Sequence, residues 1–210
     1  MYDMQMLVFN WVFAQFYFMR FILGKKLEMT QIFDNEKVIP VTLIEAGPCF
    51  VTQINDSSVQ IGYEKLKDKK VKMPQKDRPY RYLKEQKTKN GSEFKVGTKI
   101  TLLGFKEGDK VVISGITKGK GFQGGVKRHG FHGRNATHGT KHEERTIGSI
   151  GCRFPQRVLK GKRMPGRMGS DRVSVRGLKI AKIDFKNNIL AVKGAIPGHR
   201  GTLLEIRTLK

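Results

Sequence analysis

Four histidines gather in one short stretch of this 210-residue chain and could in principle ligate a metal ion. They are His129, His132, His138 and His142, with Cys152 ten residues further on. Zinc takes imidazole and thiolate ligands in tetrahedral geometry, with a hydrogen-bond acceptor behind each imidazole. Here the candidate ligands stand among many cations in a glycine-rich segment that lacks a cysteine pair. We therefore expect no metal at these residues.

The residue pattern offers no better support for acid–base or nucleophilic catalysis. Glu143 and Glu144 are the only adjacent carboxylates in this stretch, and Arg145 follows them directly. We expect them to pair with nearby cations rather than to act as acid and base. Ser149 lacks a recognisable base and orienting acid. No catalytic residue is predicted.

The segment from Lys118 to Asp171 is strongly basic and rich in glycine. It holds 13 Lys and Arg against 3 Asp and Glu, 12 of the 24 glycines and 4 of the 5 histidines. The segment has few apolar residues. The apolar surface that they could bury does not offset the entropy lost when the segment becomes ordered. Uncompensated positive charge of this size favours a polyanionic partner, and RNA is the polyanion that we expect.

Three runs within the segment have residue types that contact RNA. Glycines and lysines from Lys118 to Gly125 allow backbone N–H groups to approach phosphates. From Lys127 to Arg134, cations alternate with His and Phe, whose rings can stack on bases. From Arg157 to Gly169, cations alternate with Val, Leu and Met. The predicted RNA contacts are Lys118, Lys120, Phe122, Lys127, Arg128, His129, Phe131, His132, Arg134, His138, Lys141, Arg145, Arg157, Lys160, Lys162, Arg163, Arg167 and Arg172.

The whole chain shares this charge, with a formal net charge of +23 and an isoelectric point of about 10.2. Residues 64–95 form a second basic stretch, with 12 Lys and Arg against 5 acids. Cys49 and Cys152 are the only cysteines. Two thiols without ligand spacing favour a reducing compartment and do not build a disulfide framework.

Residues 1–18 differ from the rest of the chain. Leu7–Phe18 is mostly apolar, but twelve residues are too few to cross a bilayer. Neither a basic leader region nor a small-residue cleavage site marks a signal peptide. We expect a hydrophobic extension that docks on the domain or on a partner, or a start of translation at Met19. A membrane anchor is the less favoured alternative.

Short β-branched runs separated by turn residues lie on both sides of the basic segment. Asn187 and Asn188 are expected to form a type I′ turn, and Pro40 is expected at an edge or a bulge. Residues 64–91 are expected to be irregular or partly helical. Such short strands predict a small closed β-barrel. The expected strands are 38–45, 50–55, 58–63, 99–103, 110–116, 172–175, 178–185, 189–193 and 203–208.

Because the strands before and after the basic segment look alike, we interpret that segment as an insertion. The predicted domains are an N-terminal extension over 1–18, a barrel over 19–117 and 172–210, and a central arm over 118–171. Residues 64–95 would be a Lys-rich excursion from the barrel. A loop as long as the arm is plausible only if a partner orders it. Its few apolar residues are expected to pin its outgoing and returning strands. They are Phe122, Phe131, Ile147, Ile150, Phe154, Val158, Leu159, Met164 and Met168.

Seven motifs of the chain resemble the bacterial-type family of large-subunit ribosomal protein L-three. They occur in the family's order, and the resemblance covers Met19 to Lys210 almost without a gap. The motifs are FILGKKLEMTQIF at 21–33, TKGKGF at 117–122, KRHGF at 127–131, ATHG at 136–139, GSIG at 148–151, GKRM at 161–164 and VKGAIPG at 192–198.

The resemblance implies a mainly β fold: a six-stranded translation-protein-type barrel with a long, largely irregular arm and a Lys-rich surface excursion. It implies a non-catalytic, structural constituent of the large ribosomal subunit in the cytoplasm. Its partners would be large-subunit rRNA and neighbouring ribosomal proteins, with no cofactor, membrane or small-molecule substrate. The family helps to nucleate early subunit assembly, and its arm reaches toward the peptidyl transferase centre. By position, the arm tip would be Gly151, Cys152, Arg153, Phe154 and Pro155.

The tip is the place where this chain departs from many bacterial members of that family. Their tips are longer, and some carry a methylated glutamine. In this chain no glutamine precedes Pro155 in the tip, and Gln156 follows it. We therefore do not expect that modification here.

Two other classes of function stay open on the residues alone. A metal-dependent RNA-processing enzyme would use the four histidines. An architectural DNA-binding protein would use the basic segment, although that segment offers no helix to enter a major groove.

Overall fold

The computed structural model describes residues 21–34, 37–55, 57–88 and 94–209. The predicted N-terminal extension thus lies outside the described residues. The described chain is mainly β, which confirms the mainly β part of the predicted fold class. It divides into two compact units, of which the first combines the chain up to Ile116 with the part from Arg172 onward. The second unit is Thr117–Asp171.

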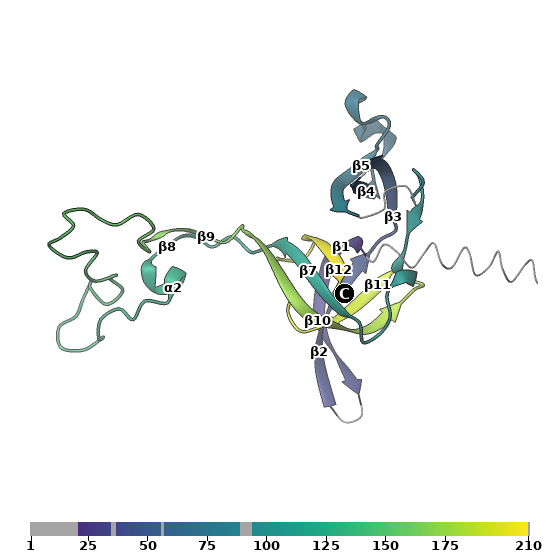
Figure 1. The fold of residues 1–210 in the computed structure, drawn as a ribbon. Helices are drawn as coiled ribbons and strands as arrows, with labels where there is room; N and C mark the ends of the chain where they lie inside the picture. Colours follow the sequence, from purple (N-terminus) through teal and green to yellow (C-terminus); the bar gives the residue numbers. More distant parts are fainter. Residues whose placement is uncertain (1–20, 35–36, 56, 89–93, 210) are drawn as a thin grey trace, which may run out of the picture. The chain divides into compact units, whose positions relative to one another are not determined.

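Six antiparallel strands of the first unit form a closed barrel (Figure 1). The hydrogen-bonded order is β1-β12-β7-β10-β11-β2, and β2 pairs with β1 to complete the ring. Closure leaves no unpaired edge in the part of the sheet that forms the ring. The strands are β1 (Phe21–Asp34), β2 (Lys37–Ala46), β7 (Lys110–Ile116), β10 (Arg172–Asp184), β11 (Ile189–Lys193) and β12 (Leu203–Thr208).

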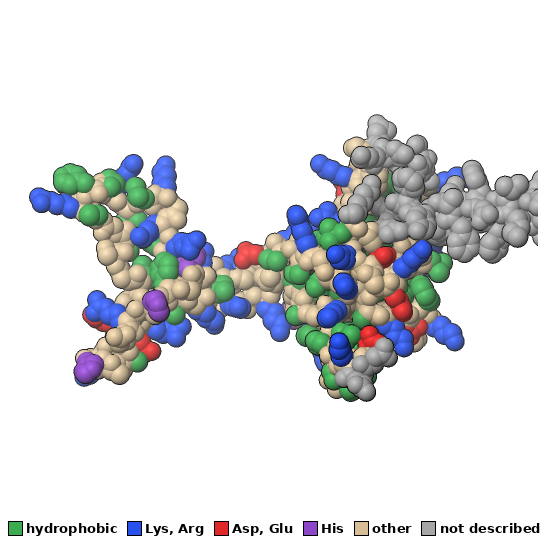
Figure 2. Space-filling model, turned by 60° about the horizontal axis from the view of Figure 1, so that its bottom comes forward, with side chains coloured by type: hydrophobic (Ala, Val, Ile, Leu, Met, Phe, Trp, Pro, Cys, Tyr) green, Lys and Arg blue, Asp and Glu red, His purple; other side chains and the backbone are tan. Residues whose placement is uncertain are grey.

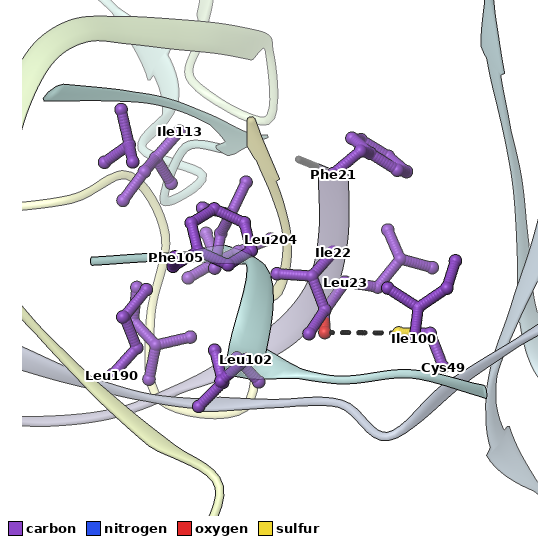
Figure 3. Close-up of a cluster of buried hydrophobic side chains, with 14 of the residues drawn as sticks. Phe21, Ile22, Leu23, Cys49, Ile100, Leu102, Phe105, Ile113, Leu190 and Leu204 are labelled. Carbon is purple, nitrogen blue, oxygen red and sulfur yellow. Dashed lines mark hydrogen bonds between the residues drawn. The ribbon is translucent and has the colours of Figure 1, made fainter. Parts of the chain in front are cut away.

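Alternating side chains explain why these segments become barrel strands. In β12, Leu204 and Ile206 are fully buried, whereas Arg207 on the same strand is exposed. Period-two burial of this kind places one side of each strand in the core. The labelled residues of Figure 3 belong to one hydrophobic cluster, which includes Phe21, Ile22 and Leu23 of β1 and Leu204 of β12.

Four strands of the first unit form a separate sheet instead of joining the barrel. The sheet has the order β5-β4-β3-β6, with β3 (Cys49–Asn55), β4 (Ser58–Lys65), β5 (Tyr80–Lys87) and β6 (Lys99–Ile100). The predicted hairpin over 50–63 is therefore present but lies outside the barrel. Its buried side chains, such as Val59 and Ile61, belong to the same hydrophobic cluster as those of the barrel.

The prediction that residues 64–91 are irregular or partly helical is wrong for β5. Two 3₁₀ turns, η1 (Asp68–Lys70) and η2 (Met73–Gln75), do lie in this range. The eight residues of β5 then pair with β4 along nearly its whole length. The sequence of β5 does not show the alternation of apolar and polar residues that predicts a strand, because it contains several charged residues. Another 3₁₀ turn, η4 (Leu102–Gly104), follows β6.

Cys49 connects the core of the second sheet to β1. Its buried thiol donates a hydrogen bond to the carbonyl oxygen of Leu23, with an S···O distance of 3.6 Å (Figure 3). Burial raises the pKa of the Cys49 thiol to about 12. A thiol that stays protonated and inaccessible is chemically inert, as expected for a structural cysteine.

The turn between β10 and β11 is longer than predicted. β10 ends at Asp184 and β11 begins at Ile189, and of the two asparagines only Asn188 has a positive φ, of 55°. A type I′ turn needs positive φ at both central residues. Here the carboxylate of Asp184 accepts hydrogen bonds from the backbone N–H groups of Lys186 and Asn187, which stabilises a four-residue loop instead.

Pro40 lies where its missing N–H group is tolerated, as predicted. β2 pairs with β11 only from Val41 to Glu45, whereas its pairing with β1 continues through Pro40 to Lys37. β1 and β2 thus extend past the barrel as a two-stranded ribbon. Pro40 is in the ribbon, where it faces a single partner strand.

The second unit contains little regular structure. Its elements are β8 (Gly121–Gln123), α2 (Gly125–His129) and β9 (Gly166–Met168), with β8 antiparallel to β9. No helix in the described ranges is long and apolar enough to cross a membrane.

Candidate nucleic-acid interface

The second unit begins with two chain segments held together by backbone hydrogen bonds. The N–H of Thr117 donates to the carbonyl of Asp171 at 3.0 Å, and that of Lys120 donates to Met168 at 2.9 Å. β8 and β9 continue this pairing, with Phe122 opposite Arg167. The outgoing and returning strands of the predicted arm are therefore paired at its base.

A polar clamp fixes the returning chain on α2. Arg128 donates from Nη1 to the carbonyl oxygen of Met164 at 2.8 Å, and a ring nitrogen of His129 lies 3.1 Å from the same oxygen. The guanidinium also covers Gly166, where an added Cβ would lie 2.5 Å from Nη1. Glycine is thus needed there for close approach. Both side chains of the clamp, Arg128 and His129, are half-buried.

Packing in this unit is confined to a small cluster beside α2. Gly125 is buried against Ile147 and Phe131, and the Phe131 ring lies 5.9 Å from that of His129. Other apolar residues face solvent, with Phe122 77% and Phe154 70% exposed. The prediction that they pin the two strands is wrong for the exposed set, which is Phe122, Ile150, Phe154, Val158 and Leu159. Backbone pairing and the polar clamp hold the strands instead.

Two projections extend from this framework in the second unit, and Figure 2 shows histidines on one of them. The histidine-bearing loop is closed where the N–H of Arg134 donates to the carbonyl of Glu144 at 2.8 Å. Arg134 also forms an ion pair with Glu143. The other loop runs from Gly148 to Met164 and ends at the clamp. Lys and Arg side chains stand out from both projections (Figure 2).

Most of the predicted RNA contacts are exposed, and few have a partner within the chain. Arg128, His129 and Phe131 are half-buried in the clamp and its cluster. Arg134 pairs with Glu143, and Arg172, which lies on β10 of the first unit, pairs with Glu205. The exposed ones are Lys118, Lys120, Phe122, Lys127, His132, Arg134, His138, Lys141, Arg145, Arg157, Lys160, Lys162, Arg163, Arg167 and Arg172.

The predicted tip residues lie together on the second projection. Gly151, Cys152, Arg153, Phe154 and Pro155 are all exposed. Close by, the Ser149 hydroxyl donates to the carbonyl of Gly151 at 2.8 Å, and the Arg157 N–H donates to that of Pro155 at 2.7 Å. These short-range bonds shape a turn that presents a cation and a phenyl ring to solvent.

The histidines do not gather into a metal site in the structure. No group of three or more His, Cys, Asp or Glu residues that could hold a metal occurs within the described ranges. The interpretation as a metal-dependent enzyme therefore finds no support. The DNA-binding alternative needs a helix that can enter a major groove. The helix described in the second unit, α2, has five residues.

One basic surface was not among the predicted contacts. It consists of exposed lysines between β4 and β5, in the first unit. The sequence did signal it, because residues 64–95 carry 12 Lys and Arg against 5 acids. Without the structure, these lysines could not be distinguished from a solvated charge run.

Comparison with known proteins identifies the family. A family model described as ribosomal protein L3 matches residues 84–187. The chain is 44% identical to the large ribosomal subunit protein uL3 of Carboxydothermus hydrogenoformans, over 89% of this chain and 95% of that protein. The protein of the same name from Thermosipho africanus is 45% identical, over 91% of this chain and 99% of that protein. The chain belongs to the ribosomal protein L3 family.

Further family members agree with this assignment. The uL3 protein of Prochlorococcus marinus is 47% identical over 90% of this chain and 93% of that protein. Because nearly the full length of each relative is covered, both units of the structure fall within the family match. The bacterial-type resemblance seen in the motifs is thereby confirmed.

Proposed function

We propose that this chain is a structural constituent of the large ribosomal subunit that binds rRNA directly through its second unit. The observation that carries the proposal is charge without internal compensation. The unit has a net charge of +10 (13 minus 3), and the only ion pair described within it joins Arg134 to Glu143. Exposed cations of this kind bind nucleic acid because they neutralise its phosphates and release the counterions bound there.

The same unit has the parts needed for a non-catalytic RNA contact. Exposed rings and guanidinium groups stack on unpaired bases, and lysines neutralise phosphates. Relatives named as large-subunit ribosomal proteins support placement on that subunit in the cytoplasm, beside rRNA and other ribosomal proteins. We further infer that the barrel, closed as in translation-protein folds, carries the second unit as an arm. By family resemblance, the arm points its Gly151–Pro155 tip toward the peptidyl transferase centre, and the protein acts early in subunit assembly.

The proposal is tested with purified full-length protein and large-subunit rRNA. Wild-type protein should bind at low salt, with an affinity that falls linearly on a log–log plot against salt. Changing Lys160, Lys162 and Arg163 to Gln should reduce that slope by about two, since each phosphate contact contributes about 0.7 to 0.9.

A matched control changes Lys179, Lys182 and Lys193, three exposed lysines of the barrel, to Gln. Both triple variants have a net charge of +20 (23 minus 3). The slope should fall less in the control than in the arm variant. Absence of rRNA binding by the wild type at low salt would rule out the proposed function.

A further inference from the structure

Six exposed lysines stand on one ordered loop of the first unit, which we call the lysine loop (residues 65–76). Within it Asp68 is the one acid. No described carboxylate lies within ion-pair distance of any of these lysines. They are Lys65, Lys67, Lys69, Lys70, Lys72 and Lys76.

Local hydrogen bonds give the lysine loop a defined shape. The N–H of Leu66 donates to the carbonyl of Pro79 at 2.8 Å and closes the loop at its base. Inside it, η1 and η2 are each stabilised by backbone bonds between residues three apart, such as Lys70 to Lys67 at 2.8 Å. An ordered loop loses less conformational entropy on binding than a flexible charge run does.

The chain that directly follows the lysine loop is seated on the four-stranded sheet. Tyr80 lies over Gly62, where an added Cβ would be 2.5 Å from the tyrosine ring, and its ring stacks on Phe50 at a centroid distance of 5.7 Å. Arg78 donates to the side-chain oxygens of Gln53 at 2.9 Å and Gln60 at 3.2 Å. These contacts occupy Arg78 and Tyr80, so they hold the loop and leave the lysines to face solvent.

The carboxylate at the start of the loop is already neutralised. Glu64 lies 2.5 Å from Nζ of Lys25 and 3.4 Å from Nη1 of Arg81. The hydrogen bond from Lys25 lowers the pKa of Glu64, and Arg81 adds to the effect. An ionised Glu64 that is committed to these two cations does not screen the lysines beyond it.

We propose that the lysine loop is a second rRNA-binding site, which takes backbone phosphates and does not read bases. The proposal rests on the proposed function, and it adds a site in the other unit of the chain. Lysine ammonium groups act as point charges on phosphates. The loop itself carries no aromatic residue and no arginine, whereas bidentate or stacking contacts with bases need such groups.

The test compares two variants of the full chain with equal net charge, +17 (23 minus 6). In the first, the six lysines of the loop become Gln. In the second, six exposed lysines elsewhere in the first unit become Gln, namely Lys37, Lys99, Lys110, Lys179, Lys182 and Lys193. Binding to large-subunit rRNA is measured over a range of salt concentrations, and circular dichroism checks that both variants fold.

We expect the salt slope of the loop variant to fall by about four to five, at about 0.7 to 0.9 per lost phosphate contact. The salt slope of the control variant should fall by less, by an amount that corresponds to at least about two fewer lost phosphate contacts. An equal decrease in the two variants, or a loop variant that retains the wild-type slope, would overturn the second site. Either result leaves the proposed function standing as long as wild-type protein binds rRNA; only failure of the wild type removes both.

Discussion

At the scale of single residues, glycines decide where other side chains fit. Gly62 is the clearest case, because its missing side chain leaves the space that the Tyr80 ring fills. The stacking of Tyr80 on Phe50 depends on that space. The absence of a side chain at Gly62 therefore positions Tyr80, in the chain that follows the lysine loop.

Gly62→Ala should destabilise the protein by about 1 to 3 kcal/mol, because the new methyl group would overlap the Tyr80 ring. Urea unfolding would show this as a lower midpoint at an unchanged m-value. The cost should shrink in a Tyr80→Leu background, since the two residues share one contact.

Gly151→Ala is the matched control for this substitution. An added Cβ at Gly151 meets no atom within 4 Å. The free energy of unfolding of Gly151→Ala should remain within about 0.5 kcal/mol of the wild-type value. Equal costs at Gly62 and Gly151 would show that the contact with Tyr80 is not the cause.

The sequence identified the charged residues better than their roles. Lys118 and Arg157 stand exposed, as an RNA contact requires, but Arg128 and His129 are engaged with the Met164 carbonyl. Exposed and clamp-bound basic residues occur in the same glycine-rich, basic sequence context. The difference arises from a contact between residues 35 or 36 positions apart, which no local pattern encodes.

At the scale of elements, the short helix α2 organises the second unit. It is a five-residue helix that places Arg128 and His129 against the returning chain. A helix this short has little stability of its own. We infer that its contacts with Met164, Phe131 and Ile147 hold it.

Arg128→Met should loosen the pairing of β8 with β9 while leaving most of the side-chain volume in place. The lost hydrogen bond to the Met164 carbonyl involves a charged donor, and such a bond contributes about 1.5 to 3 kcal/mol. Amide hydrogen exchange in β8 and β9 should therefore become at least about tenfold faster, and exchange in β7 should stay unchanged.

Lys127→Met provides the comparison, because it removes the same charge from the neighbouring exposed position. It should leave exchange in β8 and β9 at the wild-type rate. If both substitutions accelerated exchange equally, the effect would come from net charge and not from the clamp.

Element boundaries were predicted best where apolar residues alternate. The strands at 110–116 and 203–208 match β7 and β12. β5 was missed because its side chains are mostly polar or half-buried, and its strand character depends on pairing with β4. The loop after Asp184 was predicted too short, because the asparagines suggested a turn that the Asp184 carboxylate replaces.

At the scale of the whole molecule, the chain leaves the barrel after β7 and returns at β10. Ile116 and Arg172 are directly paired, so the barrel is continuous across the place where the second unit begins. Ser114 and Ser174 add a hydroxyl hydrogen bond of 2.7 Å between the same strands. The similarity of its flanks led us to predict an insertion here. The division of strands between a barrel and a second sheet depends instead on long-range pairing.

Deleting Phe122–Met168 should leave a folded barrel. The cut joins Gly121 to Gly169, and both residues have positive φ, of 68° and 80°. A Gly-Gly pair suits the type I′ turn of a tight hairpin. The shortened protein should unfold cooperatively, as followed by circular dichroism, and should bind rRNA more weakly than the full chain.

A deletion in the barrel serves as the contrast. Removing β12, which pairs with β1 and β7, should abolish cooperative unfolding, because it opens the ring and exposes its core. Loss of cooperative unfolding in the Phe122–Met168 deletion would contradict the insertion.

The direct pairing of Ile116 with Arg172 also bears on how such proteins vary among lineages. Once two strands are in register, the entropy of closing the segment between them grows only logarithmically with its length. Doubling the segment costs about 0.6 kcal/mol. Insertions and deletions beyond β8 and β9 therefore leave the barrel almost unaffected in stability. The length of the second unit becomes a property that selection can change almost independently of the folding of the barrel.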